Sequence, residues 1–101
     1  MEKKRPTYDL ESIKNAFSDT AKLSITSTAL KSARSMGFSL EEIILVIQAM
    51  KNVDFIKSMT SHADHKVWQD VYNVPWDGML LYVKITAGRV TDFHLLSFKE
   101  V

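Results

Sequence analysis

The chain has 101 residues, 46% of them hydrophobic and 25% charged, which is the composition of an ordinary folded protein, and we expect one domain over residues 1–101. It has no cysteine, which excludes disulfides and thiolate metal sites and fits a reducing cytoplasm. Its apolar runs are far shorter than the about 20 residues of a membrane span, and its charged N-terminus leads into no apolar signal core. We therefore expect a cytoplasmic protein that has no membrane partner.

The first residues of the chain predict a helix followed by a short extended segment. Either Thr7 or Asp9 can cap this helix. Its buried face is expected to carry Leu10, Ile13 and Phe17. Residues 22–25 have an extended pattern and could form a short edge strand.

Two more helices are predicted before the middle of the chain. Thr26 or Ser27 can cap the first of them, and Gly37 suits the left-handed residue that ends it. Ser39 and Glu42 have the spacing of a capping box, in which each side chain bonds the backbone N–H of the other residue. The buried face of this third helix is expected to carry Ile43, Val46, Ile47 and Met50.

The second half of the chain predicts mainly strands. Asp54 is expected to cap one short helical turn over residues 54–59, and residues 60–66 to form a polar loop. Residues 67–73 alternate as a strand, and residues 73–78 form a turn broken by proline and glycine. The result is an α+β fold, with a small antiparallel sheet of about three main strands and a possible edge strand packed against the N-terminal helices.

The last two strands are predicted to form a hairpin that turns at Gly88 and Arg89, which sets Tyr82 opposite Leu95. Side-chain alternation then gives the hairpin a polar face and an apolar face. The polar face carries Tyr82, Lys84, Ser97 and Lys99. The face toward the helices carries Leu81, Val83, Ile85, His94, Leu96 and Phe98.

Polar side chains of a particular kind interrupt this second half: lysines, a glutamine, a tyrosine and histidines. Neither metal-ligand spacing, nor a glycine-rich phosphate loop, nor a nucleophile elbow accompanies them. Such groups can hold and cleave a phosphodiester without a cofactor. Because the net charge is only +1, RNA contact would have to come from local basic clusters. The candidates for such clusters are Lys3, Lys4, Arg5, Lys57, Lys66, Lys84, Arg89 and Lys99.

Five short stretches, in this order and spacing, carry a resemblance to a known family. They are residues 54–60, 64–65, 68–72, 82–86 and 97–100. Together they resemble the motility quorum-sensing regulator toxins, the MqsR family. The resemblance covers essentially the whole chain and is strongest from residue 54 onward.

The resemblance implies a function and a partner. Members are toxins of type II toxin–antitoxin pairs, with a fold similar to the RelE-like ribonucleases. They cut single-stranded mRNA at short GC-containing motifs, independently of the ribosome, and need no cofactor. The partner is an antitoxin with a zinc-binding domain and a helix-turn-helix domain, so any contact of the toxin with DNA is indirect. The positions that match the family's active site are Lys57, Gln69, Tyr82 and Lys99.

Elementary chemistry fits these four residues to RNA cleavage through the 2′-hydroxyl, which gives a 2′,3′-cyclic phosphate and a 5′-hydroxyl. Lys57 and Lys99 can stabilise the charge of the phosphorane. Tyr82 can stack on a base or donate a proton, and Gln69 can orient the phosphate or a base edge. A lysine could act as the base only if burial or neighbouring cations lowered its pKa from about 10.4.

Further residues are candidates for assisting the active site or for binding RNA. The residues expected to assist the site are His62, Asp64, His65 and Lys84, and those expected to bind RNA are Lys66, Trp68 and Arg89. His62, Asp64 and His65 have a superficial metal-ligand pattern, but no fourth ligand stands at a sensible spacing, so we expect no metal.

Each site position also has a structural reading. Lys57 and Lys99 could be solvated, Tyr82 a packing residue, Gln69 an outward strand residue and Trp68 part of the core. The alternative function is therefore a non-catalytic module that binds RNA or protein and acts through its antitoxin as a transcriptional co-regulator.

Overall fold

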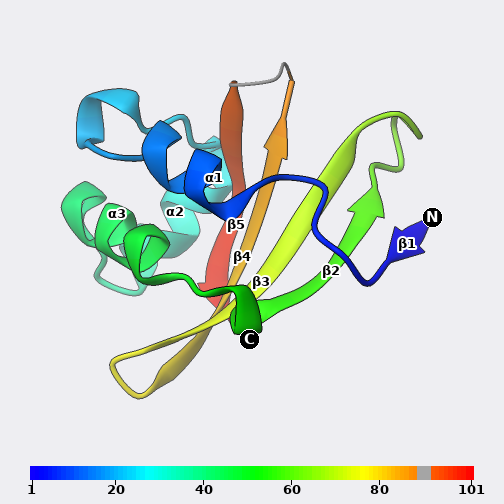
Figure 1. Ribbon diagram of the computed structural model, residues 1–101. Coiled ribbons are helices and arrows are strands. Elements are labelled where there is room, and N and C mark those ends of the chain that lie inside the picture. Colours follow the sequence, from blue (N-terminus) through cyan, green and yellow to red (C-terminus); the bar gives the residue numbers. More distant parts are fainter. Residues whose placement is uncertain (89–91) are drawn as a thin grey trace.

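The computed structural model describes residues 1–88 and 92–101, and it places helices against one face of a five-stranded antiparallel sheet (Figure 1). The strands lie in chain order: β1 (Glu2–Lys3), β2 (Phe55–Thr60), β3 (Trp68–Trp76), β4 (Met79–Ala87) and β5 (Phe93–Glu100). The helices are α1 (Leu10–Ala16), α2 (Ser27–Ser35) and α3 (Leu40–Ala49), with 3₁₀ turns η1 (Thr20–Lys22) and η2 (Asn52–Asp54). The α+β class is confirmed, and the arrangement is compatible with the RelE-like fold.

The helices begin where the sequence predicted, because their caps are local. Asp9 accepts the Ser12 N–H at 3.0 Å and caps α1, and Thr26 caps α2. Ser39 and Glu42 form the predicted capping box, with N···O distances of 3.1 and 3.2 Å. Gly37 has a φ of +87°, which a residue with a side chain rarely adopts, and follows the end of α2.

One apolar cluster fills the space between the helices and the sheet. It includes all the predicted core residues of α1 and α3. From the strands it takes Tyr72, Val74, Leu81, Val83, Ile85, Phe93, Leu95 and Phe98. Among the described residues, no helix is both long and apolar enough to cross a membrane.

The predicted helical turn over residues 54–59 is wrong: these residues leave η2 and form strand β2. Its alternation was hidden because a polar residue occupies an inward position. Ser58 is fully buried, pairs with Asp70 across the sheet, and its hydroxyl lies 2.7 Å from that of Thr7. Thr7 and Asp70 are distant in sequence, so local patterns could not show that a serine here would be satisfied when buried.

The predicted turn over residues 73–78 is also too long, since β3 continues to Trp76 and only Asp77 and Gly78 form the turn. Both have positive φ, +48° and +79°, as a two-residue hairpin turn requires. Pro75 stays in the strand, opposite Leu80 and beyond the last residue of β3 that pairs with β2. No strand pairing on that side needs the N–H that proline lacks.

The register of the last hairpin differs from the prediction. Tyr82 lies opposite Lys99 rather than Leu95. The shift of four residues is even, so Tyr82 and Lys99 still share a face, as predicted. The predicted turn at Gly88 and Arg89 reaches residues 89–91, which lie outside the described residues.

A bulge in this hairpin also changes which side chains reach the core. Lys84 pairs with Ser97 but Ile85 pairs with Leu95, which leaves Leu96 without an opposite residue. Phe93 and Leu95 therefore enter the core in place of His94 and Leu96, which were predicted there. The predicted edge strand at 22–25 is reduced to one parallel bridge, between Ile25 and Leu95.

Candidate active site

The sheet has a second face, turned away from the helices, which we call the outer face. Along β4, Tyr82, Lys84 and Thr86 alternate with core residues, so they point outward. Cross-strand pairing extends this set to the other strands. The outer face carries Glu2, Lys57, Met59, Gln69, Val71, Asn73, Pro75, Leu80, Tyr82, Lys84, Thr86, His94, Ser97 and Lys99. The four residues predicted from the sequence, on β2, β3, β4 and β5, thus lie on one face.

Lys57 stands on β2 and is held by a carboxylate from the N-terminal strand. Its Nζ donates to Glu2 Oε1 at 3.0 Å, with 31% of the lysine side chain exposed. This hydrogen bond and the charge of Glu2 raise the pKa of Lys57, and Tyr82 adds to the effect. Lys57 is therefore a fixed cation at neutral pH, suited to binding a phosphate and unsuited to removing a proton.

Tyr82 and Lys99 form a pair at the other side of the outer face. They are directly opposite each other on β4 and β5, and Lys99 Nζ lies 5.2 Å from the centroid of the Tyr82 ring. A cation at this distance over an aromatic face is attracted by the ring. The contact places a positive charge beside a phenol that remains partly exposed.

Lys84 lies at the centre of the outer face, between Val71 on β3 and Ser97 on β5. Burial, and then the charge of Lys99, lower the pKa of Lys84. Val71 is only 1% exposed although it points away from the core. The neighbouring side chains therefore cover the centre of the outer face. The pKa of Lys84 is lowered there, whereas that of Lys57 is raised.

Gln69 and Asn73 supply amide groups on β3. Gln69 is half-buried and pairs with Met59 on one side and Thr86 on the other. Asn73 lies opposite Tyr82, and its buried Oδ1 has no hydrogen-bond partner among the described residues. The sequence analysis did not single out Asn73, and it missed Glu2 altogether.

Comparison with known proteins now adds an independent observation. Residues 5–100 match the family described as "Motility quorum-sensing regulator, toxin of MqsA". The chain belongs to this MqsR toxin family. It is also 35% identical over 100 residues to the "mRNA interferase toxin MqsR" of Escherichia coli (strain K12), covering 99% of each chain. The resemblance found in the sequence is confirmed.

In this MqsR family member, other predicted residues lie away from the outer face. Trp68 points to the opposite side, where Lys3 Nζ lies 4.2 Å from its ring centroid and the Tyr8 hydroxyl donates to its carbonyl. Trp68 is half-buried and stands outside the apolar cluster, so its reading as a core residue is not confirmed, and its RNA-binding role stays a prediction. Arg89 lies outside the described residues.

The loop between β2 and β3 holds the remaining candidates, which are exposed: His62, Asp64, His65 and Lys66. Asp64 organises this loop, because its Oδ1 accepts the Lys66 N–H at 2.9 Å and its carbonyl accepts the Val67 N–H at 3.1 Å. Over residues 1–88 and 92–101, no group of three His, Asp or Glu side chains is placed to hold a metal ion. The supporting roles of these residues stay predictions.

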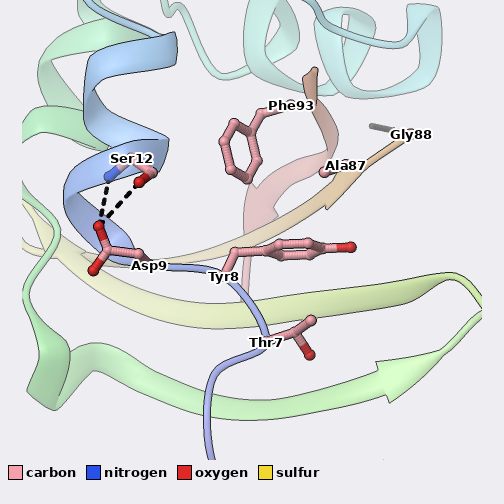
Figure 2. A pocket seen from close by; sticks show the side chains of 7 residues that line it. All are labelled: Thr7, Tyr8, Asp9, Ser12, Ala87, Gly88 and Phe93. Atoms are coloured by element: carbon pink, nitrogen blue, oxygen red, sulfur yellow. Dashed lines mark hydrogen bonds between the residues drawn. The ribbon is translucent and has the colours of Figure 1, made fainter. Parts of the chain in front are cut away.

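The chain also has a hollow of about 470 Å³ on the helix side, shown in Figure 2. The labelled rings of Tyr8 and Phe93 lie across from one another in it, and Asp9 bonds Ser12 at its edge. The four predicted site residues take no part in lining it. Of the four, Lys99 borders a smaller hollow of about 110 Å³, together with Ser97 and residues of α2.

Proposed function

We propose that the protein is an mRNA interferase, the endoribonuclease toxin of a type II toxin–antitoxin pair, and that it cleaves single-stranded mRNA at short GC-containing motifs without metal or ribosome. The observation that carries this proposal is the gathering of Lys57, Gln69, Tyr82 and Lys99 from four strands onto one face. Membership of the MqsR family supports it.

The charges on this face suit the transition state of phosphodiester cleavage. Attack of the 2′-hydroxyl on phosphorus gives a phosphorane with extra negative charge, which fixed cations stabilise. Lys57, kept protonated by Glu2, and Lys99, beside the Tyr82 ring, are placed for that role. Tyr82 would protonate the departing 5′-oxygen or stack on a base.

The shape of the site favours an extended, single-stranded substrate. A sheet face with an aromatic ring and several lysines can follow a phosphate backbone while bases stack on it. The amides of Gln69 and Asn73 have donors and acceptors for base edges, and Asn73 Oδ1 has no partner among the described residues. We assign these two amides to recognition of the cleavage motif.

The partner of the proposed toxin is an antitoxin with zinc-binding and helix-turn-helix domains. The family description names MqsA as the partner of its toxins, which supports the pairing. In this proposal the toxin meets DNA only through that antitoxin.

The test is cleavage of a defined, GC-containing single-stranded RNA by the purified protein in EDTA, compared with Lys57→Ala and Lys99→Ala. Lys31→Ala, an exposed lysine on α2, is the matched control. Wild type and control should cut and leave a 2′,3′-cyclic phosphate, while the two site variants fail although they stay folded. If wild type leaves the RNA intact but binds it, the non-catalytic binding module replaces this proposal.

A further inference from the structure

The four predicted residues lack a convincing proton acceptor for the 2′-hydroxyl. Lysine and tyrosine side chains ionise far above neutral pH, and the Glu2 carboxylate raises the pKa of Lys57 still further. Among the outer-face residues defined above, Glu2 carries the carboxylate. It stands beside Lys57, with its Oε1 3.0 Å from Lys57 Nζ.

The position of Glu2 is set by the pairing of the two-residue strand β1 with β2. Glu2 pairs with Met59 on β2, and the Thr60 N–H donates to the Met1 carbonyl at 2.9 Å. The Met1 ammonium donates to the Thr60 hydroxyl at 3.0 Å. Glu2 is thus attached to the sheet rather than carried on a free terminus.

A second attachment lies further along the N-terminal segment. The buried carboxylate of Asp70 accepts the backbone N–H groups of Thr7, at 3.0 and 3.1 Å, and of Tyr8, at 2.9 Å. Figure 1 shows this segment running from β1 across β2 and β3 to α1. Charge-assisted bonds of this kind are among the stronger ones in proteins, so β1 is held at its far end as well.

The order of the strands places these groups one after another across the sheet, as an in-line displacement at phosphorus needs. Glu2 lies on β1, Lys57 on β2, and Tyr82 with Lys99 on β4 and β5. Adjacent strands are about 4.8 Å apart, and Lys57 is aligned through Val71 with Lys84, two residues from Tyr82 on β4. Lys57 and Tyr82 are therefore roughly 12 Å apart at the backbone. A phosphate bound at Lys57 would have a carboxylate on one side and a phenol on the other.

We propose that Glu2 is a further catalytic residue, the base that accepts the proton of the attacking 2′-hydroxyl. The inference rests on the proposed ribonuclease function. In the step, the 2′-oxygen bonds to phosphorus as its proton passes to the Glu2 carboxylate. The bond from phosphorus to the 5′-oxygen breaks, and that oxygen takes a proton from Tyr82. Lys57 stays charged throughout.

The groups that face Glu2 set the pH at which it would work. The hydrogen bond and charge of Lys57 lower the pKa of Glu2 below its ordinary 4.5; burial opposes them, and the charges of Lys4 and the N-terminal ammonium lower it further. The carboxylate is therefore ionised at neutral pH. Cleavage should fall only as the pH drops through this lowered value.

Lys84, whose pKa is lowered by burial and by the charge of Lys99, is one alternative proton acceptor on the outer face, but it stands on β4, on the side of Lys57 that carries Tyr82. His94 is the other alternative. It stands on β5, at the opposite edge of the sheet from β1. Its Nδ1 is hydrogen-bonded to Ser24 Oγ, and its Nε2 lies 3.3 Å from Asp92 Oδ2. Both ring nitrogens are therefore engaged, and the geometry favours Glu2.

The experiment compares Glu2→Gln, Glu2→Asp and His94→Gln, with Glu11→Gln on α1 as the matched carboxylate control. Cleavage rates are measured against pH, and affinity is measured with a fully 2′-O-methylated copy of the RNA. Glu2→Gln should lose about 10²–10⁴-fold in cleavage rate, bind the methylated RNA at least as well as wild type, and show no acidic limb below pH 4.5. Glu2→Asp, His94→Gln and Glu11→Gln should keep the limb.

Three results would overturn the inference while leaving the ribonuclease assignment in place. Glu2→Gln could cleave at the wild-type rate, it could cleave slowly with an unchanged acidic limb, or His94→Gln could be the variant that loses the limb. The second result would make Glu2 a positioning residue for Lys57. Failure of wild type itself to cleave would overturn both proposals.

Discussion

The two faces of the sheet are built from the same strands but have opposite chemistry. Tyr72 and Tyr82 show the contrast: Tyr72 points into the core and is fully buried, whereas Tyr82 points outward beside Lys99. They belong to adjacent strands, and Tyr72 pairs with Val83, the immediate neighbour of Tyr82. One residue of register therefore separates a packing position from one proposed to be functional, and substitutions on the two faces should be detected by different measurements.

The largest loss of stability is expected at Phe98, on the face of the sheet that packs against the helices. Its side chain is fully buried and its ring meets that of Phe38 edge to face, with centroids 5.1 Å apart. Phe98→Ala should lower the free energy of unfolding by about 3–5 kcal/mol, because it leaves a cavity. Urea denaturation checks this. A loss below 1 kcal/mol would mean that Phe98 does not pack as described.

The next largest effect is expected for Lys57 on the outer face, where a substitution should reduce cleavage without changing stability. Lys57→Ala removes a cation proposed to stabilise the phosphorane, and cleavage should fall about 10²–10³-fold, or roughly 3–4 kcal/mol of transition-state stabilisation. Its melting temperature should stay close to that of wild type, because the ion pair with Glu2 is at the surface. A clearly lower melting temperature for Lys57→Ala would show that Lys57 contributes to stability, as the core residues do.

A smaller effect is expected at Asp70, where the N-terminal segment is attached. Asp70→Ala leaves the part-buried N–H groups of Thr7 and Tyr8 without their acceptor and should cost about 1–3 kcal/mol of stability. Hydrogen exchange should then show faster opening of β1. Unchanged protection at Lys3 and Thr7 would mean that β1 is held without Asp70.

The smallest effect at neutral pH is expected for Tyr72→Phe. The Tyr72 hydroxyl is buried with no hydrogen-bond partner among the described residues, so its removal should change stability by less than about 1 kcal/mol, in the stabilising direction. Tyr82→Phe, the matched change on the outer face, should instead reduce cleavage and leave stability unchanged.

High pH should magnify the effect at Tyr72. Burial, followed by the charges of Asp70 and Asp9, raises the pKa of Tyr72 from 10.0 to about 12. Between these values the unfolded chain releases the phenol proton and the folded chain keeps it, so wild-type stability should fall as the pH rises. Tyr72→Phe should make that fall shallower in denaturation measured from pH 9 upward. An identical slope would contradict the assignment.

The predictions that succeeded from the sequence rest on contacts between near neighbours. The caps at Asp9, Thr26 and Ser39 each bond a backbone group three residues away, so the pattern contains both partners. The prediction that Tyr82 and Lys99 share a face was also confirmed, because the error in the hairpin register was an even number of residues.

The predictions that failed rest on partners that are remote in sequence. Strand β2 was mistaken for a helical turn because the Ser58 hydroxyl is satisfied by Thr7 and Ser58 pairs with Asp70 across the sheet, and neither residue is near it in the chain. His94 was placed in the core because a bulge that leaves Leu96 unpaired has no local signature. Glu2 was overlooked because a charged N-terminus ordinarily stays in solvent.

The α+β class, the helix caps and the core-facing stripes follow from the residues alone, as does a set of polar residues whose order matches one toxin family. The folded chain was needed to show that Lys57 lies on a strand, that it shares a face with Gln69, Tyr82 and Lys99, and that Glu2 holds its ammonium group. The reason is physical: helix caps form within a few residues, but the face of a sheet exists only once strands from both ends of the chain have paired.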